Sequence, residues 1–149
     1  MERKIQAAEL FVQGYNCAQA VAAAFSDVMD LPKERVAKMA SPFGGGIAGE
    51  REVCGAVNGM VIVLGWLYGY ESPDEGEKKR TYKQASDMIE EFRKVNGNIL
   101  CRELLKNMPV DPNPTPQTAA YYAKRPCARM VMVAADLLEK FISEHPIEK

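Results

Sequence analysis

Residues 54–68 read CGAVNGMVIVLGWLY and contain no charged side chain. A helix that is apolar on nearly every side is typical of the buried centre of a helical protein. We therefore predict a central buried helix from about Cys54 to Tyr68. It is too short to cross a membrane, which takes about 20 apolar residues, and glutamates flank it on both sides. The chain is accordingly expected to have no membrane span.

Helical periodicity continues on both sides of this segment, and no stretch alternates as a strand would. Further helices are expected over residues 2–13, 16–27 and 33–39, from the charged region after residue 71 to about Val95, around Cys101, and over 126–143. A stripe on the long helix is expected to face the core: Tyr82, Ala85, Met88, Ile89 and Phe92. Prolines between residues 109 and 116 predict an extended loop. We predict an all-α fold, a single-domain helical bundle of about six to seven helices over residues 1–149.

Four cysteines share one predicted placement, at the start of a separate helix: Cys17, Cys54, Cys101 and Cys127. Asn16 is a favoured N-cap residue and places Cys17 at the first helical position. Asn98 is expected to cap the helix of Cys101, which would then occupy the third position. Pro126 suits a first helical position and makes Cys127 the second. The start of the helix near Cys54 has no unique cap.

A helix start favours the thiolate form of a cysteine, because unpaired N–H groups and the positive end of the helix dipole face the sulfur. Arg51 near Cys54 and Arg102 beside Cys101 should favour thiolate further. The thiolate is the form that binds metals and attacks disulfides. For any one cysteine the alternative is a purely structural role, since free cysteine is among the most buried residue types.

Two groups of glycines lie near Cys54. Residues 44–49, GGGIAG, formally match the G-x-G-x-x-G dinucleotide fingerprint, but no strand is predicted before them. We expect Gly44, Gly45 and Gly46 instead to form a loop whose N–H groups face anionic sulfur, with a simple connector as the alternative. Gly55 and Gly59 lie one helical turn apart, where either a cofactor or another helix could approach closely. These five glycines are candidate cofactor contacts.

The segment Cys54-Gly55-Ala56-Val57-Asn58-Gly59 has the form C-G-A-x-x-G, with one cysteine before it and two after it. In this order of cysteines, nearly the whole chain resembles a family of redox-active proteins named for a C, GCAxxG, C, C pattern. The chain departs from that label as written, because Val53 precedes Cys54 and Gly55 follows it. The resemblance implies a redox role for the four cysteines and no particular reaction.

Three functions are compatible with these cysteines. In the first, all four converge to bind an Fe–S cluster for electron transfer, with zinc as the other metal suited to four thiolates. In the second, a cysteine pair without metal carries out thiol–disulfide exchange. In the third, a non-catalytic helical module buries its thiols and uses apolar faces for oligomerisation. Successive cysteines are separated by 36, 46 and 25 residues, so the first function requires four distant elements to meet.

Composition limits the partners and the compartment. A net charge of −1 and the lack of a basic cluster make nucleic acid a poor expectation. His145 is the only histidine, which argues against Ser-His and Cys-His nucleophiles. The N-terminal residues lack the apolar core of a secretion signal, so we expect a cytoplasmic protein without a static disulfide framework. A redox partner protein is expected, and a homodimer is left open.

Overall fold

The computed structural model describes residues 1–106 and 127–147. Within these residues the chain forms eight α-helices, six of them at least seven residues long, and no strand. The elements are α1 (Arg3–Val12), α2 (Cys17–Ala23), α3 (Ser26–Met29), α4 (Lys33–Ala40), the 3-10 helix η1 (Ser41–Phe43), α5 (Gly55–Tyr68), α6 (Glu75–Asn96), α7 (Cys101–Leu104) and α9 (Cys127–Glu144). The all-α prediction is confirmed. The proline-rich loop lies outside the described residues, and the single-domain assignment stays a prediction.

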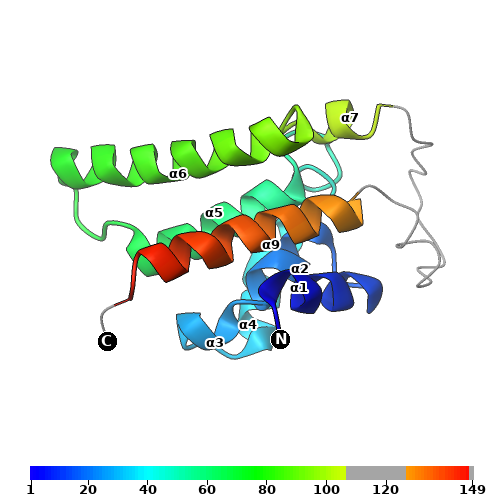
Figure 1. The fold of residues 1–149 in the computed structure, drawn as a ribbon, viewed down its shortest axis with the longest axis horizontal. Coiled ribbons are helices and arrows are strands. Elements are labelled where there is room, and N and C mark those ends of the chain that lie inside the picture. The colour runs from blue at the N-terminus through cyan, green and yellow to red at the C-terminus, as the bar shows by residue number, and fades with distance from the viewer. Residues whose placement is uncertain (107–126, 148–149) are drawn as a thin grey trace.

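Helix α5 lies at the centre of the arrangement, with α2, α6 and α9 packed against it (Figure 1). Its buried residues, which include Met60 and Val63, fall in the part of the helix up to Leu64. The last turn reaches the surface, where Trp66 is 54% exposed and its indole N–H donates to the carbonyl of Met29 at 2.8 Å. The predicted burial of this helix therefore holds as far as Leu64 and fails for the last turn. In the described ranges, no helix has the length and apolar character to span a membrane.

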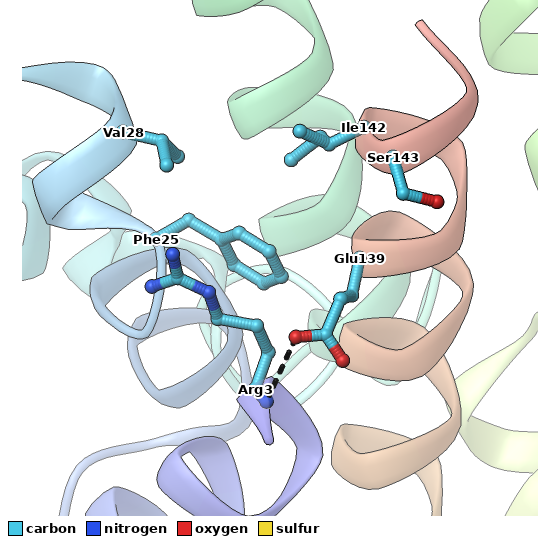
Figure 2. Close-up of a pocket in the computed structure, with 6 residues that line it drawn as sticks. All are labelled: Arg3, Phe25, Val28, Glu139, Ile142 and Ser143. Carbon is cyan, nitrogen blue, oxygen red and sulfur yellow. Dashed lines mark hydrogen bonds between the residues drawn. The ribbon is translucent and has the colours of Figure 1, made fainter. Parts of the chain in front are cut away.

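The helix expected over residues 16–27 is in fact two helices, and Arg3 lies at the break. The Arg3 guanidinium donates to the carbonyl of Ala24 at 2.8 Å and pairs with Asp27 at 2.6 Å. A continuous helix would use that carbonyl for the N–H four residues later. The backbone N–H of Arg3 also reaches the Glu139 carboxylate of α9, as Figure 2 shows. Arg3 thus joins α1 to the α2–α3 junction and to α9.

Helix α6 begins at a side-chain cap, because the Asp74 carboxylate accepts the N–H of Glu77 at 2.9 Å. It runs along α5 and α9 in Figure 1 and buries Met88 and Phe92. The prediction that Tyr82 faces the core is wrong, since its side chain is 62% exposed. Tyr82 lies at the edge of the stripe, with the Lys78 ammonium 5.6 Å from its ring centre.

The closest approach of α2 to α5 occurs at Gly59 and provides a stability test. A Cβ on Gly59 would lie 2.6 Å from the Ala18 carbonyl oxygen and 3.1 Å from the Val21 Cβ. Overpacking of this kind costs about 1–3 kcal/mol, against roughly 1 kcal/mol gained in helix propensity. We expect Gly59→Ala to lower the free energy of unfolding by up to about 2 kcal/mol, measured by chemical denaturation.

Gly65→Ala is the matched control, because Gly65 belongs to the same helix and a Cβ there would meet no atom within 4 Å. This variant should gain about 0.5–1 kcal/mol from the better helix propensity of alanine. Equal stability of the two variants would contradict the close α2–α5 contact.

Candidate functional site

A short backbone pairing brings the starts of α5 and α7 together. The N–H of Cys54 donates to the carbonyl of Ile99 at 2.7 Å, and the N–H of Cys101 donates to the carbonyl of Glu52 at 2.6 Å. These two bonds flank an isolated antiparallel β-bridge. Two cysteines that are far apart in the sequence therefore lie on neighbouring backbone segments. Figure 1 shows the first turns of α5, α7 and α9 at the same end of the molecule.

Cys17 is held at the start of α2 by a reciprocal cap. The Asn16 side chain accepts the N–H of Gln19 at 2.9 Å, and the Gln19 side chain accepts the N–H of Asn16 at 3.0 Å. Cys17 is the first helical residue, as predicted. Its sulfur lies against Gly55, where an added Cβ would overlap Cys17 Sγ. A glycine directly after Cys54 is thus what lets the sulfur of Cys17 lie close to the start of α5.

The glycine-rich segment forms a loop over two of the cysteines. The backbone N–H of Gly45 faces the sulfur of Cys17, and a Cβ on Gly46 would lie 2.7 Å from the Cβ of Cys101. Both glycines have left-handed φ angles, 65° and 74°, which glycine adopts at no steric cost. Gly44 instead lies against the Asn16 side chain.

Helix α4 and η1, not a strand, precede this loop. The structure therefore gives no support to the dinucleotide fingerprint, which requires a strand at that position.

The expectation that helix starts would hold these thiols as thiolates is wrong for Cys17 and Cys54. Burial raises the pKa of the Cys17 thiol, and the N–H groups of Gly45 and Ala18 only partly oppose it. Burial likewise raises the pKa of the Cys54 thiol, helped by charge on Cys17 and opposed by the N–H groups at the start of α5. Desolvation of a charged sulfur outweighs the helix terminus here. Both side chains therefore favour the neutral thiol.

Electrostatic interactions link the four cysteines in pairs. Charge on Cys101 acts on Cys17, and charges on Cys17 and Cys127 act on Cys54. The four thiols thus form one connected group, and none of the four is in a disulfide. Within residues 1–106 and 127–147, however, no three Cys, His, Asp or Glu side chains are arranged so that they could hold a metal ion.

The caps at the other two helix starts differ from the predictions. Cys101 is the first residue of α7 and not the third, because the Asn98 side chain accepts the N–H groups of Ile99 and Leu100 in a preceding turn. Cys127 is the first described residue of α9, and Pro126 lies outside the described residues. Cys54 is the N-cap residue of α5.

The two arginines also act differently from the expectation. Arg51 Nη1 lies 3.7 Å from the sulfur of Cys101, a contact that the sequence did not indicate. Arg102 follows Cys101 in the sequence but pairs with the Glu52 carboxylate at 3.3 Å. Sequence distance alone could not assign these side chains, because the contact of Arg51 depends on the pairing of the α5 and α7 starts.

A surface pocket of about 200 Å³ lies elsewhere, between the start of α1, the α2–α3 junction and the end of α9 (Figure 2). Its apolar lining includes Phe25, Val28 and Ile142. None of the four cysteines lines it. The pocket is therefore separate from the group of thiols.

Exposure predicts an order of thiol reactivity in the reduced, metal-free protein. Cys17, Cys54 and Cys101 are 6–8% exposed, whereas Cys127 is half-buried. We expect iodoacetamide to modify Cys127 on the order of tenfold faster than the other three, since burial limits the access of the reagent to their sulfurs. Peptide mass spectrometry of a time course measures the four rates. The differences should vanish in denaturant, and four equal rates in the native protein would contradict the described burial.

A comparison with known proteins identifies a family that is named for a pattern of four cysteines. Residues 15–141 match the family model described as "Putative redox-active protein (C_GCAxxG_C_C)". A search of curated proteins and a search of solved structures each found no match. The matched residues include all four cysteines and the glycine-rich loop. The chain therefore belongs to this family of redox-active proteins with four cysteines.

Proposed function

We propose that the four cysteines bind an Fe–S cluster and that the protein transfers electrons. The observation that carries the proposal is a connected group of four thiols, three of them buried, with backbone N–H groups directed at the sulfurs of Cys17 and Cys54. Four cysteine thiolates are the usual ligand set of such clusters. N–H groups aimed at ligand sulfurs are among the features that tune them.

The chemistry of the four cysteine side chains fits an Fe–S cluster. Two of the sulfurs are buried as neutral thiols, since burial raises the pKa of both Cys17 and Cys54. A metal deprotonates a coordinating thiol outright, which removes the cost of a bare buried charge. Attack on an external disulfide has no such compensation, because it requires an accessible thiolate. The buried thiols therefore favour metal ligation over exchange with a partner.

The residues around the sulfurs have separate roles in this proposal. The N–H of Gly45 would hold the sulfur of Cys17, and the N–H groups of Ala56 and Val57 would hold that of Cys54. The apolar core keeps water away from both. When bound, the cluster would supply a one-electron redox centre.

Binding requires the thiols to come closer than they are in the described structure. No three of them are arranged for a metal at present, so side chains would have to rotate toward a common point. The sulfur of Cys17 already lies against Gly55, the residue that directly follows Cys54.

Disulfide chemistry without metal is the second candidate function. It is favoured by the coupling of Cys17 to Cys54, since two close thiols are sufficient for it. Zinc bound by the same four thiolates would instead be a structural site. An electron-transfer role also requires a partner protein as donor or acceptor. A homodimer would not alter the proposed ligand set.

Four single Cys→Ser variants, analysed with the wild-type chain after purification without oxygen, test the proposal. Iron, zinc and acid-labile sulfide are measured together with the visible absorption spectrum. We expect iron and sulfide in comparable amounts in the wild type. Cys54→Ser should lose both, because serine does not replace a thiolate ligand, and the other three variants should lose most of them. Helicity measured by circular dichroism should stay largely unchanged.

The pattern across the four variants separates the candidates. Wild-type iron and sulfide content in Cys54→Ser would refute the cluster ligation. A metal-free wild type whose thiols form one disulfide, lost in only two of the variants, would favour the dithiol function. Zinc without sulfide would indicate a structural site.

A further inference from the structure

Arg51 is a cation in direct contact with a cysteine sulfur. Its Nη1 lies 3.7 Å from Cys101 Sγ, within hydrogen-bonding distance of sulfur. The side chain is half-buried and makes no ion pair with any carboxylate of the described residues. Its positive charge is therefore directed at the thiol and is not neutralised by an acid.

The backbone fixes Arg51 at this position. Arg51 has a left-handed φ of 62°, a conformation that residues other than glycine adopt rarely. Its N–H donates to the carbonyl of Gly45 at 3.1 Å, and its carbonyl accepts the N–H of Arg102 at 3.2 Å. One bond ties Arg51 to the glycine-rich loop and the other ties it to α7. The glycine-rich loop and the helix that begins at Cys101 thus both hold the arginine.

Arg102 is the natural comparison, because it is the direct neighbour of Cys101 in the sequence. Its guanidinium is half-exposed and lies 3.3 Å from the Glu52 carboxylate. Its charge is thus paired with an acid and largely solvated, where such pairs have little effect. Of the two arginines, only Arg51 contacts the sulfur.

We infer that Arg51 is a positioning residue of the proposed redox site: it orients the sulfur of Cys101 and places an unpaired positive charge beside it. The inference rests on the proposed function. When a one-electron donor protein reduces the site, one negative charge is added there, and a cation in contact with a ligand sulfur favours that reduced state. Arg51 should therefore raise the reduction potential. Without a cofactor, the same charge should attract anionic reagents to Cys101.

The first experiment measures this charge in the reduced, metal-free chain. Iodoacetate and iodoacetamide both form an S–C bond with the thiolate and release iodide, but only iodoacetate is anionic. The exposure and the protonation of the thiol affect both reagents equally. The ratio of their rates at Cys101 therefore depends on the charge near the sulfur. Arg51→Gln should lower the ratio by about threefold or more. Arg51→Lys should keep most of the wild-type ratio, and Arg102→Gln should leave it unchanged.

The same ratio of rates, measured in the wild-type chain at increasing salt concentrations, is an independent test. It does not depend on whether a variant folds. High salt screens charge, so the iodoacetate-to-iodoacetamide ratio at Cys101 should fall toward that of a small thiol. The ratio at the half-buried Cys127 provides an internal reference. A salt-independent ratio at Cys101, or equal ratios in Arg51→Gln and the wild type, would overturn the inference.

The second experiment uses protein that contains iron and sulfide and is titrated with dithionite. Arg51→Gln should keep its iron and sulfide content and become about tenfold harder to reduce, which is about 59 mV for a one-electron couple. Arg102→Gln should keep the wild-type potential, and an equal shift in both variants would refute a specific role for Arg51. If no preparation contains iron and sulfide, the cluster proposal fails. The ratio of the two alkylation rates then still decides whether Arg51 places a positive charge beside the sulfur of Cys101.

Discussion

The close approach of α2 to α5 is the constraint on which the rest of the site depends. Gly55 and Gly59 leave room for the start of α2, so that the Cys17 sulfur and the Ala18 carbonyl lie where side chains would otherwise be. Small residues on α2, including Ala18 and Ala22, are fully buried. The interior of a protein is densely packed, so a contact of this kind leaves few alternative positions for the two helices. The C-G-A-x-x-G motif is therefore in part a packing motif.

Much of the fold follows from local sequence signals. The apolar run of α5 and the Asn16 cap are both short-range features, and each lies where the pattern indicates. The break between α2 and α3 could not be predicted in this way. It involves Arg3, a residue far from the break in the sequence, whose preference for the Ala24 carbonyl depends on how α1 packs.

The position of the cysteines at helix starts was predictable, and their electrostatics were less so. The four cysteines and the N–H of Gly45 facing sulfur follow from helix starts and from the behaviour of glycine loops. The pKa values of Cys17 and Cys54 are raised, whereas the helix starts predicted lowered values. The reason is desolvation, which depends on the depth of burial, and local sequence does not encode that depth. The contact between Arg51 and Cys101 also requires the backbone pairing of two segments about 50 residues apart.

The packing of α1 on α9 has a consequence for folding during synthesis. Ala7, Leu10 and Phe11 of α1 are buried, and α9 is a major contact of this helix. Yet α9 leaves the ribosome more than one hundred residues after α1. Contacts between such distant segments form slowly, because a long loop must close first. Until α9 emerges, part of the apolar face of α1 stays uncovered, and such a surface is one that chaperones bind and that promotes aggregation.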